Sequence, residues 1–136
     1  MVIDKSNYKK YMSSDTIMNC SHRNITEIRY LPDGLVVLDS YHNQITSLPK
    51  LPNSLVRLDC ENNQLTSLPK LPDSLESLFC YNNQLTSLPD LPDGLERLYC
   101  HHNRLPIDGH FYSKEAIKEF KIRLDNIIKL EEFLVD

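Results

Sequence analysis

LPDGLVVLDSYHNQITSLPK spans residues 31–50, LPNSLVRLDCENNQLTSLPK spans 51–70, and LPDSLESLFCYNNQLTSLPD spans 71–90. A fourth copy, LPDGLERLYCHHNRL, follows at 91–105, so the pattern returns every 20 residues. A fixed period of roughly 20 to 50 residues indicates a repeat architecture in which each unit packs against its neighbours. We therefore predict a solenoid, which offers an extended binding surface instead of a single deep pocket.

Each repeat contains a short alternation that predicts a β-strand. Leucine and cysteine stand two positions apart, as in Leu58 and Cys60, so both lie on one face of an extended chain. Stacked coils then form a parallel sheet whose inner face makes the core. We call the outward side of these strands the concave face, and the main residues expected on it are Asp39, Tyr41, Arg57, Asp59, Glu61, Phe79, Tyr81, Arg97, Tyr99 and His101.

The rest of each coil carries prolines and an asparagine. All 8 prolines follow a leucine, and Leu–Pro pairs stand three residues apart at 48–52, 68–72 and 88–92. Proline fixes φ and favours an extended preceding residue, so we expect polyproline II or tight turns, without helices, on the convex side. The asparagines where each coil leaves its strand should bond the backbone groups of the bend; they are Asn43, Asn63, Asn83 and Asn103.

The cysteines occupy one position of the coil. Cys60, Cys80 and Cys100 recur in register, and Cys20 fits the same slot. Neighbouring thiols about 4.8 Å apart meet the distance for a disulfide, but parallel Cβ vectors fit its dihedral poorly. We expect buried, reduced thiols and hence a reducing compartment. Alternation separates Cys100 from His101, so we expect no metal site; His22 and His42 could approach each other on adjacent coils.

Composition and motifs exclude several function classes. The formal charge of −4 argues against a nucleic-acid surface, and no apolar run is long enough to span a membrane. Asp4 and Lys5 interrupt the first residues, so we expect no signal peptide. No nucleophile stands with a base and an orienting acid, and we expect Asp39 and Asp59 to be a solvated pair. The sequence therefore predicts neither an enzyme nor a cofactor site.

The unit NQLTSLPxLPxSLxxL resembles the short LPX-type leucine-rich repeat of bacterial secreted effectors of the IpaH and YopM groups, and short repeats of giant viruses of amoebae. The resemblance covers 31–105 and weakly 15–28, and its residues in the first full repeat are Leu35, Leu38, Asn43, Ile45, Leu48, Pro49, Leu51 and Pro52. It implies repeats that bind target proteins. Some of these effectors add a ubiquitin-ligase domain with a catalytic cysteine, but residues 106–136 contain no cysteine.

We expect four segments along the chain. Residues 1–14 form an N-terminal cap segment, 15–30 a degenerate first rung, 31–110 the leucine-rich repeats, and 111–136 a C-terminal capping helix. Helical spacing of apolar residues supports the last segment: Ile117, Phe120, Leu124, Ile127, Ile128 and Leu134. This helix either folds over the open end of the core or binds a partner or a membrane surface; its mixed charges weaken the membrane alternative.

Two functional hypotheses follow. The first is a non-enzymatic protein-interaction module that binds an unknown protein through the concave face. It would act in the cytoplasm, either of its own cell or of a host cell, and a host protein is one candidate partner. Aromatic and arginine residues dominate binding hot spots, so the expected contacts are Tyr41, Arg57, Phe79, Tyr81, Arg97, Tyr99 and His101. The second is a self-associating structural or virion component that pairs through the exposed N-terminal sheet edge or the C-terminal helix. The oligomeric state is left open.

Overall fold

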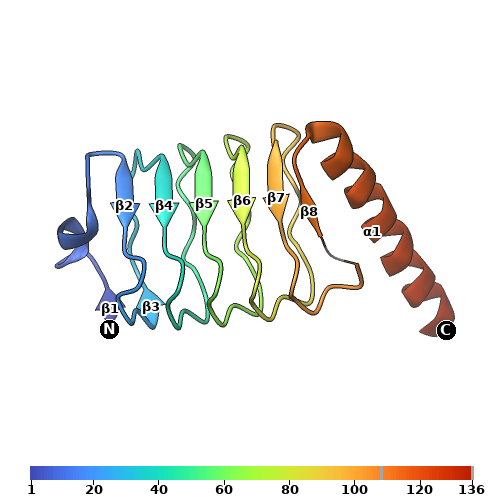
Figure 1. Ribbon diagram of the computed structural model, residues 1–136, viewed down its shortest axis with the longest axis horizontal. Helices are drawn as coiled ribbons and strands as arrows, with labels where there is room; N and C mark the ends of the chain where they lie inside the picture. Colours follow the sequence, from blue (N-terminus) through green and yellow to red (C-terminus); the bar gives the residue numbers. More distant parts are fainter. Residues whose placement is uncertain (108, 136) are drawn as a thin grey trace.

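The computed structural model, which describes residues 1–107 and 109–135, is a solenoid of stacked coils with one helix at its C-terminal end (Figure 1). The main sheet has the order β2-β4-β5-β6-β7-β8. Its strands are β2 (Ile17–Asn19), β4 (Val37–Asp39), β5 (Arg57–Asp59), β6 (Ser77–Phe79), β7 (Arg97–Tyr99) and β8 (His110–Phe111). From β2 to β7 each strand pairs in parallel with the next, which confirms the predicted solenoid.

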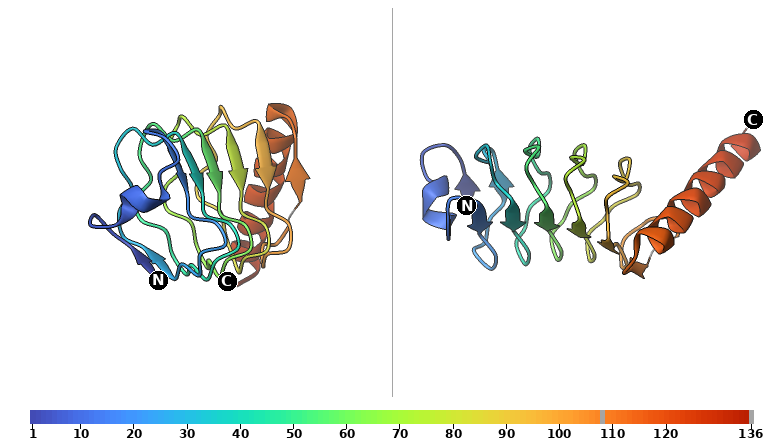
Figure 2. Two further views of the ribbon diagram at one scale, coloured as in Figure 1. Left: turned by 60° about the vertical axis from the view of Figure 1, so that its left-hand side comes forward. Right: turned by 90° about the horizontal axis from the view of Figure 1, so that it is seen from above.

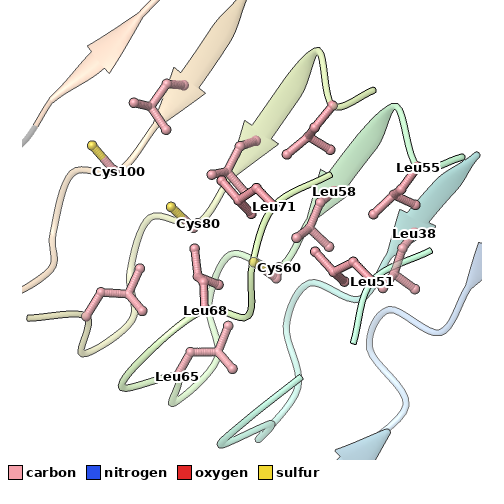
Figure 3. Packing of buried hydrophobic residues seen from close by; sticks show 14 of the residues in the cluster. Leu38, Leu51, Leu55, Leu58, Cys60, Leu65, Leu68, Leu71, Cys80 and Cys100 are labelled. Atoms are coloured by element: carbon pink, nitrogen blue, oxygen red, sulfur yellow. The ribbon is translucent and has the colours of Figure 1, made fainter. Parts of the chain in front are cut away.

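The 20-residue register aligns equivalent residues across the sheet. Leu38 lies beside Leu58, which lies beside Leu78. All three are fully buried, as are Cys60 and Cys80, which lie two positions beyond Leu58 and Leu78. Figure 3 shows Leu38, Leu58 and these two cysteines in the core. Leu51 and Leu71 on the return path close the core from the other side (Figure 3). The predicted inner face is therefore confirmed, and burying leucine in every coil supplies most of the stabilisation, at about 1.5–3 kcal/mol per side chain.

The convex side runs without a helix in the described residues. Each Leu–Pro segment ends in a tight turn closed by a backbone hydrogen bond, such as Leu55 N to Pro52 O at 3.1 Å and Leu75 N to Pro72 O at 3.1 Å. The Ser74 hydroxyl of one turn donates to the Leu55 carbonyl of the preceding coil at 2.6 Å. The extended convex side predicted from the prolines is confirmed, and its thinness explains how a coil closes in 20 residues.

The asparagines form a ladder that joins each coil to the one before it. Asn63 Oδ1 accepts the Ile45 N–H at 3.0 Å, and Asn63 Nδ2 donates to Ser40 O at 3.0 Å and Cys60 O at 3.1 Å. Asn43, Asn83 and Asn103 repeat this geometry. The predicted role is confirmed, and the bonds cross between coils as well as within one.

The residue before each ladder asparagine has a left-handed backbone, a feature not predicted from the sequence. Its φ is 54° at His42, 54° at Asn62, 53° at Asn82 and 55° at His102. Asparagine and histidine are among the non-glycine residues most often found in this region. This requirement explains why Asn–Asn and His–Asn pairs recur at the same point of the coil.

Cys20, Cys60, Cys80 and Cys100 are buried and form no disulfide, as predicted. Burial raises the pKa of Cys20 to about 12 and raises the pKa of Cys60 and Cys80 as well. A thiol reacts through its thiolate, so these groups are protected both by burial and by their protonation.

We expect all four cysteines to react slowly with a thiol reagent in the native protein. Four equivalents should react after denaturation, as counted by absorbance and by mass spectrometry. Rapid native labelling, or an intramolecular disulfide in the purified protein, would contradict the buried, reduced assignment.

The N-terminal segment folds against the first coil. β1 (Val2–Ile3) pairs in parallel with β3 (Glu27–Ile28), and a 3₁₀ turn follows at Tyr8–Tyr11. Ser13 N donates to Ile17 O at 2.9 Å, so this segment partly covers the free edge of β2. We expected that edge to be exposed, and this expectation is wrong for the part next to Ser13.

The C-terminal end is covered by β8 and α1 (Lys114–Val135). β8 pairs antiparallel with β7, and the Ser113 hydroxyl caps the helix by accepting the Ala116 N–H at 3.1 Å. The helix expected over 111–136 thus begins at Lys114, because residues 110–111 belong to the sheet; position 136 lies outside the described residues.

Only the first half of α1 acts as a cap. Ile117, Phe120 and Leu124 are buried on the last coil, whereas Ile128 and Leu134 are exposed. Figure 2 shows the reason, since α1 diverges from the solenoid as it proceeds. The predicted capping helix is confirmed, and of the residues with helical apolar spacing, Ile128 and Leu134 lie outside the part that packs on the core.

Candidate functional site

The C-terminal half of the concave face holds a continuous group of rings. Phe79 and Tyr99 meet edge to face at 4.7 Å between centroids, and Tyr81 stacks on His101 at 4.6 Å. Tyr112, just after β8, packs against Tyr99 at 5.4 Å. We call this group the aromatic cluster, and its members are Phe79, Tyr81, Tyr99, His101, His110 and Tyr112.

The structure brings together most of the residues expected to bind a partner, but not all of them. Tyr41 lies apart from the aromatic cluster, where it contacts the rings of His22 and His42. Arg57 borders the aromatic cluster, because its guanidinium lies 5.1 Å from the centroid of the Phe79 ring. Arg97 is exposed on the edge-proximal strand β7, beside Ser77.

His110 and Tyr112 were not among the residues predicted from the sequence to bind a partner. They follow the last repeat, so no periodicity predicted their position; the available signal was the alternation in His110–Phe111–Tyr112, which is typical of a strand. Because β8 pairs with β7, it adds these two rings to the same face.

Phe79 is less accessible than we expected. Only 8% of its surface is exposed, because Arg57 and Tyr99 cover its ring. The expectation that it presents a free aromatic surface is therefore wrong. Tyr99 is half-buried and Tyr112 is 65% exposed, so these rings offer the contact area instead.

Carboxyl groups gather at the centre of the concave face. Asp39 and Asp59 are neighbours across β4 and β5, and Arg57 lies between them, at 3.8 Å from Asp39 Oδ1 and 3.5 Å from Asp59 Oδ2. Only 6% of Asp59 is exposed. The expected solvated pair is wrong: the aspartates are neighbours, but Asp59 is buried.

Glu61 completes this group, which we call the acidic centre: Asp39, Asp59 and Glu61 with Arg57. Burial, together with the nearby charge of Glu61, raises the pKa of Asp59 to about 7. Burial also raises the pKa of Asp39, against the opposing effect of Arg57. The Tyr81 hydroxyl bonds the Glu61 side chain, and burial and this bond raise the pKa of Tyr81. The acidic centre therefore keeps a proton to a higher pH than a solvated carboxyl group would.

Two further features lie outside these groups. The rings of His22 and His42 stack at 4.5 Å, as their spacing predicted. A groove of about 590 Å³ runs between α1 and the last coil, lined by residues such as Leu91, Leu95 and Ile122.

Among residues 1–107 and 109–135, no three histidine, cysteine or acidic residues are grouped to hold a metal ion. In the same residues, no helix has the length and apolarity needed to cross a membrane.

Comparison with known proteins supports the fold and its class. No protein-family model and no curated protein sequence matches the chain. Among solved structures, YopM from Yersinia enterocolitica WA-314 is 41% identical over 61% of this chain and 19% of its own, with a TM-score of 0.58. A Shigella effector LRR domain is 36% identical over 72% of this chain and 46% of its own, with a TM-score of 0.67. The chain thus spans less than half the length of either structure.

Proposed function

This chain is a leucine-rich repeat protein of the short, 20-residue type seen in bacterial effectors, and on that basis we propose that it is a protein-interaction module that binds a partner through its concave face. The observation that carries the proposal is the aromatic cluster. Aromatic side chains supply large contact area, and tyrosine and arginine are enriched in binding hot spots.

The accessible part of the aromatic cluster is suited to a partner. Tyr99 and Tyr112 contact each other and remain at least partly exposed, and Arg97 lies on the same strand as Tyr99. Because the rings hold one another in place, little side-chain freedom remains to be lost on binding. Packing within the sheet does not account for Tyr112, because this ring follows β8 and remains exposed.

We infer that the module acts in a reducing compartment, such as the cytoplasm of a host cell. The supporting observation is the column of buried cysteines that form no disulfide, since thiols stay reduced inside cells. The partner is then a protein of that compartment. The concave face presents aromatic and charged side chains on short strands, which agrees with a non-enzymatic binding role.

We expect the double variant Tyr99→Ala, Tyr112→Ala to weaken partner binding by about 1–4 kcal/mol while leaving the solenoid folded. The partner is first captured from a host-cell lysate by the immobilised wild type and identified by mass spectrometry. Its purified form is then titrated by calorimetry against each variant. The double variant Lys50→Ala, Lys70→Ala, on the convex side, serves as the control and should bind as the wild type does.

One outcome would overturn this assignment. If binding survives in the tyrosine double variant but is lost when residues 125–136 are removed, the C-terminal helix carries the function. The deletion keeps Ile117, Phe120 and Leu124, which belong to the core, so the repeats should stay folded. Circular dichroism of each variant checks that they do.

A second candidate function, self-association, is favoured by the exposed end of α1. Leu130, Phe133 and Leu134 are between 61% and 80% exposed on a helix that leaves the solenoid. Light scattering over a range of protein concentrations tests this alternative. A monomer at every concentration would eliminate it, and a dimer that dissociates in the 125–136 deletion would support it.

A further inference from the structure

The acidic centre carries more negative than positive charge. Asp39, Asp59 and Glu61 contribute carboxyl groups, and Arg57 is the cation among them. Its distances of 3.8 Å and 3.5 Å are longer than the ~2.7–2.9 Å of a charge-assisted hydrogen bond, so Arg57 neutralises the aspartates incompletely. A site with unbalanced charge on a binding face points to a ligand of the opposite sign.

A second observation comes from Asp59 itself. The residue is 6% exposed, and its Oδ1 is buried and accepts no hydrogen bond from a donor in the described residues. A buried carboxyl oxygen without a donor is costly. The Asp59 side chain has both the Glu61 backbone N–H and the Glu61 carboxyl group within hydrogen-bonding range, and two carboxyls can bond only by sharing a proton.

Glu61 lies between two tyrosines on the concave face. Tyr41, Glu61 and Tyr81 occupy the same position of successive coils, which are joined by His42 N to Glu61 O and Asn62 N to Tyr81 O, both at 3.1 Å. Two strand spacings place the tyrosine backbones about 9–10 Å apart. The rings pack against His22 and His101, on the sides away from Glu61.

We propose that the acidic centre binds a lysine or arginine side chain of the protein partner, with Glu61 and Asp39 as its accessible counter-ions, Asp59 beneath them, and Tyr41 and Tyr81 on either side. This inference rests on the proposed function and names the chemistry of the partner. Arg57 shows that the same face accommodates a guanidinium between carboxylates and over a ring. Tyrosine rings add cation–π attraction for the incoming group.

The bound cation takes the place of the shared proton. Because the pKa of Asp59 is about 7, the proton is present below neutral pH and competes with the ligand; above neutral pH the centre is fully charged. A lysine side chain stays charged throughout this range. Affinity therefore rises with pH between about 6 and 8, by at most about tenfold per unit for one displaced proton.

Other groups near Asp59 bear on this dependence. They are Asp39 on β4, Arg57 on β5, Glu61 after β5, Tyr81 after β6, and the histidines His22, His42 and His101 beyond the two tyrosines. The Asp59→Asn variant isolates the contribution of Asp59, because it removes the shared proton and leaves the other groups in place.

The test is a nuclear magnetic resonance titration of the ¹⁵N-labelled full chain with a capped glycine–lysine–glycine tripeptide at low ionic strength. We expect the amide signals of Tyr41, Glu61 and Tyr81 to shift together and to saturate. The same peptide with acetylated lysine should cause no such shifts. Binding should weaken at least fivefold in Glu61→Gln, and Asp59→Asn should lose most of the pH dependence between 6 and 8.

A matched control removes the same charge elsewhere. Glu76→Gln changes an exposed glutamate outside the acidic centre and should bind as the wild type does. Equal weakening in Glu76→Gln and Glu61→Gln, or equal shifts with acetylated lysine, would overturn the site. So would the absence of shifts at Glu61 in a folded protein, as judged by the rest of the spectrum.

The tripeptide titration needs no partner, so it separates the two proposals. If it fails while Tyr99→Ala, Tyr112→Ala still weakens partner binding, the cation site is wrong and the interaction module stands. If it succeeds while the tyrosine variant binds the partner normally, the cation site stands and the aromatic cluster is not the hot spot.

Discussion

Leu78→Ala should lower the free energy of unfolding by about 2–5 kcal/mol, the range for truncating a fully buried leucine that leaves a cavity. Leu78 is 0% exposed and lies in β6, with Leu58 and Leu98 beside it in register. The neighbouring coils are fixed by their own strands and asparagines, so they have little freedom to collapse into the space. The large end of the range is therefore expected here.

Urea unfolding followed by circular dichroism measures this loss. Leu134→Ala is the matched control, because Leu134 is 80% exposed at the far end of α1, and it should change the stability by less than about 0.5 kcal/mol. A Leu78→Ala variant as stable as the control would mean that the 20-residue register is wrong. A broadened transition in Leu78→Ala alone would show that the cavity uncouples the two halves of the solenoid.

The interior of this protein was predictable because it repeats. Leu58, Cys60 and Asn63 each recur at the same position of several coils, so one local argument about alternation or bending applied to each of them. The period also determined the strand register, because equivalent residues of successive coils lie side by side in the sheet. Fold class, core column, convex turns and asparagine ladder all followed from this periodicity.

The ends and the burial of concave side chains were not predictable in the same way. β8 follows the last repeat, and the C-terminal half of α1 diverges from the core, so the 20-residue period predicts neither of them. Phe79 and Asp59 occupy strand positions that alternation assigns to the outside. Their burial depends on Arg57, whose length allows it to cover a residue on its own strand and one on the next. Alternation predicts the face of the sheet to which a side chain points. It does not predict whether neighbouring side chains bury it there.

Part of the candidate site was nevertheless present in the sequence. Asp39, Asp59 and Glu61 could be placed close together from the register alone, and only their burial was missing. That burial changes their chemistry, because it raises the pKa of Asp59 to about 7 where a solvated pair would stay charged. Burial between neighbouring coils therefore makes Asp39 and Asp59, which were expected to be a solvated pair, part of a candidate binding site.

Replacing Asn63 by alanine should lower the free energy of unfolding by about 2–4 kcal/mol, because several buried backbone groups lose their partner at once. The groups affected are the Ile45 N–H and the carbonyls of Ser40 and Cys60. The left-handed backbone at Asn62 stays, so the bend keeps its strain without the bonds that compensate it. Asn63 is 8% exposed, which limits replacement of these bonds by water.

Asn63→Asp tests the direction of the bonds. An aspartate has the same shape and can still accept the Ile45 N–H, but its ionised carboxylate faces the Ser40 and Cys60 carbonyls without a proton to donate. It should be at least as destabilising as alanine at neutral pH and should recover stability in mild acid, where the carboxyl is protonated. Unfolding curves at both pH values, with exposed Gln64→Ala as the control, measure the difference.

Hydrogen exchange adds a local readout, because the Ile45 amide should lose protection in Asn63→Ala but keep most of it in Asn63→Asp. A neutral Asn63→Ala, with Ile45 still protected, would mean that the turn is held by the backbone alone and that the ladder does not stabilise it.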